Sequence, residues 1–157
     1  MESSQITKEM VINAQNKWGD GIVKIGADFM EKVDFTETAR NHIATLYAYD
    51  LSPVLFKPTK AAMEQFRSTK ESALSYFVAT NGVCAEDKGF AIQPWTKVRF
   101  ENSDIIISGN TAQAMGNYFF TDTDGNEVKV EYTFGYMIDG NGDLRINLHH
   151  SSVPFSA

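Results

Sequence analysis

The last strand-like segment of the chain ends in the run His149 to Ser152, which reads His-His-Ser-Ser. An imidazole titrates near neutral pH, and hydroxyl groups both donate and accept hydrogen bonds. These residue types can therefore move protons and hold a small oxygen-bearing substrate. Segment 144–148 alternates Leu, Ile and Leu with polar residues, and the period of two continues that apolar face onto His150 and Ser152. The same rule places the other histidine and serine of the run on the opposite face.

The residues alone leave two interpretations open for this pair. A histidine on the inner face of a strand end is commonly a hydrogen-bonded core residue, and a functional role is the alternative. Tyr76, Tyr132 and Tyr136 are likewise either pocket hydroxyls or core aromatics whose hydroxyl groups reach water or backbone. His149 is most simply a surface or interface residue.

No metal or cofactor site is predicted. The three histidines, His42, His149 and His150, and the single cysteine, Cys84, do not have the spacing of a zinc site. The turn 139–143 faintly resembles a calcium loop but lacks the later glutamate of an EF-hand. The sequence also has no glycine-rich phosphate loop and no serine nucleophile elbow.

The elements that must position these residues are helices first and strands afterwards. Apolar residues every three or four positions predict a long helix over about 10–29, and Asp34 with Glu37 predicts the start of a second. Ser68 to Glu71 resembles a capping box and predicts a third helix through Val78. The short extended segment 51–56 contains a proline, which confines it to an edge or a strand start.

Alternating residues after position 90, separated by turn signals, predict five strands at 92–100, 105–108, 111–121, 128–138 and 144–152. Connections this short make neighbouring strands antiparallel. We therefore expect an α+β fold in which N-terminal helices pack on one face of a strongly curved antiparallel sheet, as a single domain over 1–157. Such a sheet leaves a cavity between itself and the helices.

Composition narrows the functional classes. The 157 residues carry 14 Lys and Arg against 20 Asp and Glu, a net charge of −6, which argues against a nucleic-acid partner. No apolar stretch approaches the ~20 residues of a membrane span, and the start of the chain does not resemble a signal peptide. We expect a soluble protein with no membrane partner.

Several segments together carry a family resemblance. The closing run 148–154, after an Asp-x-x-Gly turn, resembles the end of domains in the NTF2-like superfamily, especially those related to the association domain of calmodulin-dependent kinase. Five further segments resemble the iota-class carbonic anhydrases of algae, diatoms and bacteria, some of which work without a metal: 45–50, 55–59, 73–77, 116–120 and 132–136. The resemblance covers most of the chain, from about Trp18 to Pro154.

The resemblance implies an NTF2-like cone-shaped barrel and a carbonic anhydrase, a lyase that reversibly hydrates carbon dioxide to bicarbonate without a bound metal or other cofactor. By motif, the threonine of Lys-Pro-Thr is Thr59 and the tyrosine of Ser-Tyr-Phe is Tyr76. Within His-His-Ser-Ser, the alternation of side chains between the two faces of the strand favours His150 and Ser152. We expect His150 to move a proton or orient the attacking water, and the three hydroxyl groups to bind that water or the bicarbonate oxygens.

Two rival functions remain at the level of sequence. NTF2-like domains often only oligomerise or bind a small ligand. A ketosteroid-isomerase-like or polyketide-cyclase-like enzyme would need a carboxylate in the pocket, for which Asp50 and Glu131 are the candidates. The superfamily resemblance also implies a homodimer through the outer sheet face, and it permits a plastid or periplasmic location and a place in a tandem array.

Overall fold

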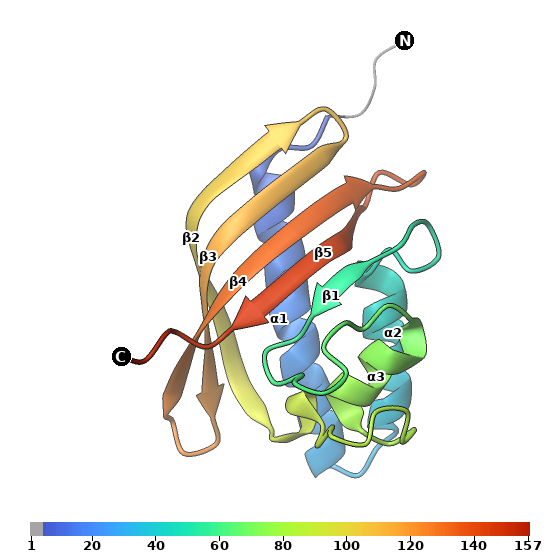
Figure 1. The fold of residues 1–157 in the computed structure, drawn as a ribbon, viewed down its shortest axis with the longest axis vertical. Helices are drawn as coiled ribbons and strands as arrows, with labels where there is room; N and C mark the ends of the chain where they lie inside the picture. Colours follow the sequence, from blue (N-terminus) through green and yellow to red (C-terminus); the bar gives the residue numbers. More distant parts are fainter. Residues whose placement is uncertain (1–4) are drawn as a thin grey trace.

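The computed structural model describes residues 5–157 as three helices packed on one face of a curved five-stranded sheet (Figure 1). The first four residues, on which part of the signal-peptide prediction rests, lie outside the described residues. The α+β prediction is confirmed. Within residues 5–157, no helix combines the length and apolarity that crossing a bilayer would need.

Each of the three helices begins after a residue whose side chain caps it. The helix α1 (Lys8–Met30) starts after Thr7, whose hydroxyl accepts the Met10 N–H, and α2 (Phe35–Leu46) starts after Asp34, whose carboxylate accepts the Glu37 N–H at 3.1 Å. The helix α3 (Lys70–Val78) has its capping box one residue later than predicted, between Thr69 and Ser72. Each cap satisfies N–H groups that the first helical turn leaves unpaired.

Glycines on α1 allow close contact with its neighbours. A Cβ atom on Gly21 would lie 2.1 Å from Nδ1 of His42 on α2, and one on Gly26 would lie 2.9 Å from the carbonyl oxygen of Ala91. Neither space could hold an alanine without movement of the neighbour. Glycine weakens a helix relative to alanine, but Gly21 and Gly26 let α2 and the short 3-10 helix η1 (Phe90–Ile92) approach α1 closely.

The sheet has the strand order β1-β5-β4-β3-β2. Its long strands β2 (Trp95–Ser108), β3 (Thr111–Asp122), β4 (Glu127–Ile138) and β5 (Leu144–Ser152) are antiparallel neighbours, as predicted. The short β1 (Leu55–Lys57) lies on the edge and pairs parallel to β5. The sheet is thus mixed rather than purely antiparallel, because β1, which precedes α3 in the chain, pairs parallel with the last strand.

The predicted turn at 102–104 is wrong. Residues 95–108 form one strand, interrupted by a bulge between Asn102 and Asp104. Opposite this bulge lies Gly116, where a Cβ atom would be 2.1 Å from the carbonyl oxygen of Glu101. The bulge bends the strand and so adds to the curvature of the sheet.

A second bulge lies in β5, and it reverses the predicted facing of the residues that follow it. Tyr136 pairs with Ile146 and Gly135 pairs with Leu148, so Asn147 has no partner across the sheet. Beyond this extra residue, His149 is 2% exposed and faces the helices, whereas His150 is exposed. The predicted inward placement of His150 is therefore wrong.

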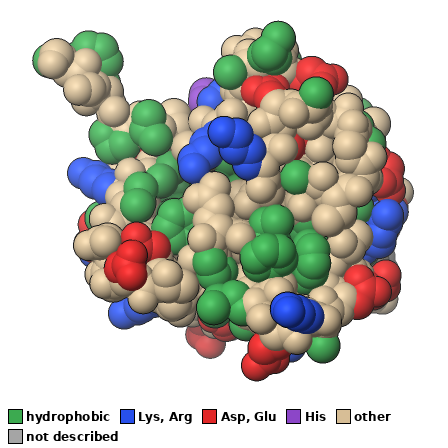
Figure 2. Space-filling model, turned by 90° about the horizontal axis from the view of Figure 1, so that it is seen from below, with side chains coloured by type: hydrophobic (Ala, Val, Ile, Leu, Met, Phe, Trp, Pro, Cys, Tyr) green, Lys and Arg blue, Asp and Glu red, His purple; other side chains and the backbone are tan. Residues whose placement is uncertain are grey.

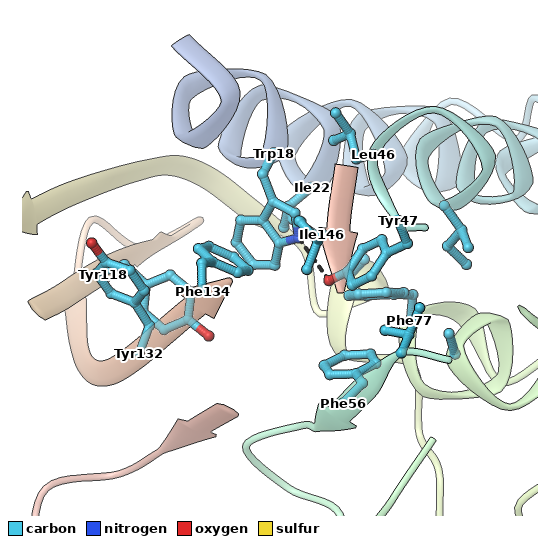
Figure 3. Close-up of a cluster of buried hydrophobic side chains, with 14 of the residues drawn as sticks. Trp18, Ile22, Leu46, Tyr47, Phe56, Phe77, Tyr118, Tyr132, Phe134 and Ile146 are labelled. Carbon is cyan, nitrogen blue, oxygen red and sulfur yellow. Dashed lines mark hydrogen bonds between the residues drawn. The ribbon is translucent and has the colours of Figure 1, made fainter. Parts of the chain in front are cut away.

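The aromatic core fills the space between sheet and helices (Figure 3). Trp18 is 1% exposed; it stacks on Tyr118 of β3 with ring centroids 5.5 Å apart and meets Phe134 of β4 edge-on. All three helices and all five strands contribute buried side chains to one cluster. The single domain over 1–157 stays a prediction, which this common core supports.

Charges on the lower face of the molecule are mixed in sign. Figure 2 shows Lys and Arg side chains among Asp and Glu side chains there, around a group of hydrophobic ones. No broad basic stripe crosses this face, and phosphate recognition depends on such a stripe.

Candidate active site

A row of buried polar side chains crosses the core and joins α1 to β5. The indole Nε1 of Trp18 donates to the hydroxyl oxygen of Tyr47 at 3.0 Å (Figure 3). That hydroxyl lies 2.8 Å from Nδ1 of His149, and Nε2 of His149 lies 3.1 Å from the hydroxyl of Tyr118. Each of these side chains is at most 2% exposed. The row therefore places an imidazole between two tyrosines, out of contact with bulk water.

The row continues to the loop after β1. The hydroxyl oxygen of Tyr118 and Oγ of Ser151 are hydrogen-bonded at 2.5 Å, and Ser151 shares a second 2.5 Å hydrogen bond with Oγ1 of Thr59. The hydroxyl of Tyr76 on α3 accepts the Lys60 N–H at 3.3 Å and interacts with the Thr59 side chain. We call Trp18, Tyr47, His149, Tyr118, Ser151 and Thr59 the polar row.

Proton positions along the polar row have two consistent arrangements. The indole of Trp18 can only donate, but each hydroxyl can donate to either side and the imidazole carries its proton on either nitrogen. If Nε2 of His149 is protonated, the hydroxyls of Tyr118 and Ser151 point towards Thr59. If Nδ1 is protonated, the same hydroxyls point towards the imidazole. The tautomer of His149 thus sets whether the row donates or accepts at its Thr59 end.

Burial keeps the polar row uncharged. His149 stacks on Phe56 with ring centroids 4.7 Å apart, and the ring of Phe134 lies 4.3 Å away. Burial lowers the pKa of His149 well below its usual value, with smaller contributions from His150 and His42. Burial also raises the pKa values of the Tyr47 and Tyr118 hydroxyls. Both kinds of group are therefore neutral near pH 7.

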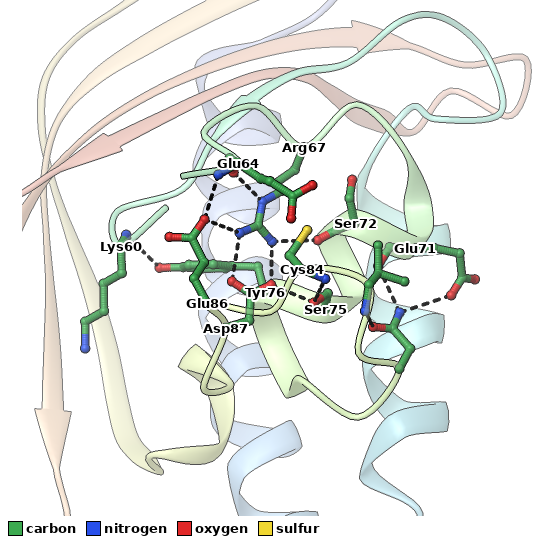
Figure 4. A network of polar contacts seen from close by, with 12 residues as sticks. Lys60, Glu64, Arg67, Glu71, Ser72, Ser75, Tyr76, Cys84, Glu86 and Asp87 are labelled. Atoms are coloured by element: carbon green, nitrogen blue, oxygen red, sulfur yellow. Dashed lines mark hydrogen bonds and ion pairs between the residues drawn. The ribbon is translucent and has the colours of Figure 1, made fainter. Parts of the chain in front are cut away.

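A buried ion pair fixes the segment that carries Thr59 (Figure 4). The guanidinium of Arg67 is fully buried and binds both carboxylate oxygens of Asp87, at 2.6 and 2.7 Å. The Ser75 hydroxyl donates to Asp87 at 2.6 Å. The carboxylate of Glu86 accepts the backbone N–H groups of residues 62–64, which lowers its pKa. These contacts tie residues 58–69 to α3 and to the loop after it.

The structure brings together two of the four predicted site residues. Thr59 and Tyr76 meet at the end of the polar row. His150 and Ser152 instead lie on the outer face of the sheet, where they line a groove of about 370 Å³ with Glu131, Thr133 and other residues. The bulge at Asn147 is the cause, because it shifts the side-chain alternation of β5 by one position.

The rival carboxylates do not reach the polar row. Asp50 is bound by Arg145 at 2.5 Å near the surface, and Glu131 lies in the outer groove. Among residues 5–157, no three His, Cys, Asp or Glu side chains are grouped closely enough to hold a metal ion. Within this described range, the core therefore supplies imidazole, indole and hydroxyl groups.

Five members of the polar row were not predicted from the sequence as site residues: His149, Ser151, Tyr47, Tyr118 and Trp18. The first two were assigned to the wrong face, and the others were treated as apolar core residues or not singled out. One available signal was the number of hydrogen-bonding aromatics on apolar faces, because a buried Tyr or Trp normally finds a partner for its polar atom.

Comparison with known proteins gives one consistent family. Residues 9–153 match the sequence model of a family described as metal-independent carbonic anhydrase. A metal-independent carbonic anhydrase from Nostoc sp. is 42% identical over 153 residues, which is 96% of this chain and 75% of the Nostoc protein.

Solved structures agree on the fold. An iota-carbonic anhydrase from a cyanobacterium, crystallised with bicarbonate, has a TM-score of 0.96 and 39% identity, covering 100% of this chain and 98% of that one. A chain from Xanthomonas campestris, described as a calcium/calmodulin-dependent protein kinase II association domain, has a TM-score of 0.65 and 20% identity, covering 99% and 97%. An NTF2-like protein from Salmonella enterica has a TM-score of 0.59 and 15% identity, covering 96% and 92%.

Proposed function

This chain belongs to the metal-independent carbonic anhydrase family, and we propose that it interconverts carbon dioxide and bicarbonate through the side chains of the polar row. The enzyme is a lyase of the iota class with an NTF2-like fold. The observation that carries the site assignment is the continuous hydrogen-bonded connection from His149 to Ser151 and Thr59. His149 and Ser151 replace His150 and Ser152 in the proposal, and Thr59 and Tyr76 are kept.

Hydration requires that a water oxygen bond to the carbon of carbon dioxide while the water loses a proton. In the proposed reaction, the water donates its proton to Oγ1 of Thr59. Each hydroxyl of the row then passes its own proton one place towards Nε2 of His149. The imidazole becomes an imidazolium, and all the hydroxyls now point towards the bicarbonate that has formed.

The reversed hydroxyls have a second effect on the reaction. They donate hydrogen bonds towards the oxygen that gains negative charge, and one strong donor of this kind contributes about 2.7–4 kcal/mol. After bicarbonate leaves, the imidazolium, disfavoured by burial, returns its proton through Tyr118, Ser151 and Thr59 to the water that takes its place, which restores the starting arrangement of the hydroxyls. The aromatic shell excludes competing water from these hydrogen bonds.

Stopped-flow measurement of carbon dioxide hydration tests this proposal. The protein is first treated with a chelator and analysed for metals. We expect H149A to lose about 10²–10⁴-fold in kcat, because it loses the proton acceptor. The matched control is H150A, one residue away on the outer face, which should keep nearly full activity. Full activity in a folded H149A protein would refute the assignment.

We also propose that the enzyme is a homodimer through the outer sheet face. The groove containing His150, Ser152, Glu131 and Thr133 makes this face concave, and Met115 beside them is 58% exposed. An apolar side chain exposed in a polar groove favours burial by a partner. Light scattering after size exclusion at micromolar concentration tests the proposal, and a monomer there would refute it.

A further inference from the structure

A cavity of about 280 Å³ opens beside Tyr76, lined by Lys60, Tyr76, Glu86, Asp87, Lys88, Gly89, Phe90 and Gln93. We propose that this cavity is the port where bicarbonate docks on the ammonium groups of Lys60 and Lys88 on its way to and from the polar row. The inference rests on the proposed function, which supplies the anion. We call the cavity the lysine port.

The lysine port lies beside the candidate site, with the Tyr76 side chain between them. Lys60 follows Thr59 in the chain, and its N–H donates to the Tyr76 hydroxyl, whereas its side chain extends away from that hydroxyl (Figure 4). The Tyr76 ring stacks on Phe90 with centroids 5.6 Å apart, and both rings line the port. A ligand in the port is thus one tyrosine away from Thr59.

The two acidic residues of the port are already paired inside the protein. Asp87 accepts three hydrogen bonds from Arg67 and Ser75. Glu86 accepts the backbone N–H groups of residues 62–64 and lies 3.7 Å from Arg67. Both carboxylates are therefore already hydrogen-bonded to donors of the protein itself.

The two lysines are not paired in this way. Lys60 makes a 3.4 Å hydrogen bond to the neutral amide of Gln93 and lies 5.9 Å from the centre of the Phe90 ring. In the described part of the chain, neither Lys60 nor Lys88 has a carboxylate within 4.0 Å. The unmatched charge in the port is positive, which favours an anion over neutral carbon dioxide.

The size of the cavity fits a small hydrated anion. A water molecule occupies roughly 30 Å³ in the liquid, so 280 Å³ holds bicarbonate together with several waters. Bicarbonate has oxygens on three sides and can contact an ammonium group and the Gln93 amide at once. The lysines would then raise the local bicarbonate concentration without taking part in the chemistry.

Bicarbonate dehydration kinetics at pH 8 and low ionic strength test the lysine port. The double variant K60Q/K88Q should raise KM for bicarbonate about fivefold, since it removes two exposed charge contacts with the anion. Its kcat should stay within about twofold of the wild type. The overall equilibrium is unchanged, so kcat/KM for hydration must fall by the same factor as kcat/KM for dehydration.

Three comparisons make this test specific. K60R/K88R should restore KM, and raised inert salt should remove the difference between wild type and K60Q/K88Q. K8Q/K17Q removes two exposed charges from α1 and should leave KM unchanged. An unchanged KM in K60Q/K88Q, or an equal rise in K8Q/K17Q, overturns the proposal.

Equilibrium binding separates the port from the proposed function. Titration of the ¹⁵N-labelled protein with bicarbonate should shift the amide signals of Gly89 and Phe90, and in K60Q/K88Q these shifts should saturate at about fivefold higher bicarbonate concentration. If the shifts occur in a protein without hydratase activity, the proposed function fails and the port stands. If the protein is active and the shifts are absent, the port fails alone.

Discussion

At the scale of residues, neighbouring side chains of the same type have different environments. His149 is stacked between aromatic rings and bonded to two tyrosines, whereas His150 is exposed on the other side of the sheet. Burial lowers the pKa of His149 far below 6.5 and leaves it neutral at physiological pH. The residue can therefore accept a proton only briefly, which suits a relay better than storage.

The serines allow the same contrast to be tested. S151A removes the oxygen between Tyr118 and Thr59, so we expect kcat for hydration to fall about 10²-fold or more. S152A alters only the outer groove and should stay within about twofold of the wild type. Stopped-flow assays of carbon dioxide hydration measure kcat for both variants. Equal losses in the two variants would contradict the assignment of the inner face.

The four residues predicted as the site lie in two different places in the structure, for a physical reason. Thr59 and Tyr76 belong to segments that resemble the family closely, and the structure places them together. His150 and Ser152 were chosen by strict alternation, which fails where a strand contains an extra residue. Nothing in the identity of Asn147 marks it as that residue.

At the scale of elements, the segment 58–69 depends on a buried ion pair. Its Arg67 side chain is fully buried, and the Asp87 side chain is 3% exposed. Burying two charges is unfavourable unless both are hydrogen-bonded, and here the guanidinium also donates to the carbonyl oxygens of Ser72 and Glu64. The ordered position of Thr59 thus depends on contacts made eight or more residues away.

Removing one partner of this pair should be severe. D87A removes the bidentate partner of the buried Arg67 guanidinium and leaves it only the Glu86 carboxylate, 3.7 Å away, so we expect a loss of about 3–5 kcal/mol in the free energy of unfolding. Urea titration followed by circular dichroism measures it. The exposed Arg40–Glu71 pair provides the control, since E71Q should cost less than about 1 kcal/mol. A D87A protein as stable as E71Q would refute the structural role of the pair.

The elements differ in how well they could be predicted. Apolar spacing predicted α1 to within about two residues of each end, and local capping residues predicted the start of α2 closely and that of α3 within one residue. The two strands predicted at 92–108 are one strand, because polar residues at 102–104 form a bulge that looks like a turn. The parallel pairing of β1 depends on a partner about 90 residues away, which no local pattern reveals.

At the scale of the whole molecule, the core contains two neutral histidines. Burial lowers the pKa of His42 to about 4, and the pKa of His149 is also lowered. In the unfolded chain, both imidazoles have a pKa near 6.5. Below that pH the unfolded state takes up protons that the folded state does not, so acid should favour unfolding.

The free energy of unfolding should therefore fall as the pH drops from 7 to 5.5. The expected slope below pH 6.5 approaches about 1.4 kcal/mol per pH unit for each buried imidazole. Urea unfolding at several pH values measures it. H42Q should remove about half of the slope, whatever its effect on stability at pH 7. The same slope in H42Q as in the wild type would show that His42 does not cause the effect.

The bulge at Asn147 has a consequence for how the gene can change. If a deletion upstream slid β5 by one place against β4, His150 would come to lie beside Phe134 and Ser152 beside Tyr132, the places that His149 and Ser151 hold now. Asn147 would then take the buried place of Ile146, so stability would fall while the imidazole and hydroxyl remained. The doubled His-His-Ser-Ser run thus means that a one-residue deletion before β5 still leaves an imidazole and a hydroxyl at these two places.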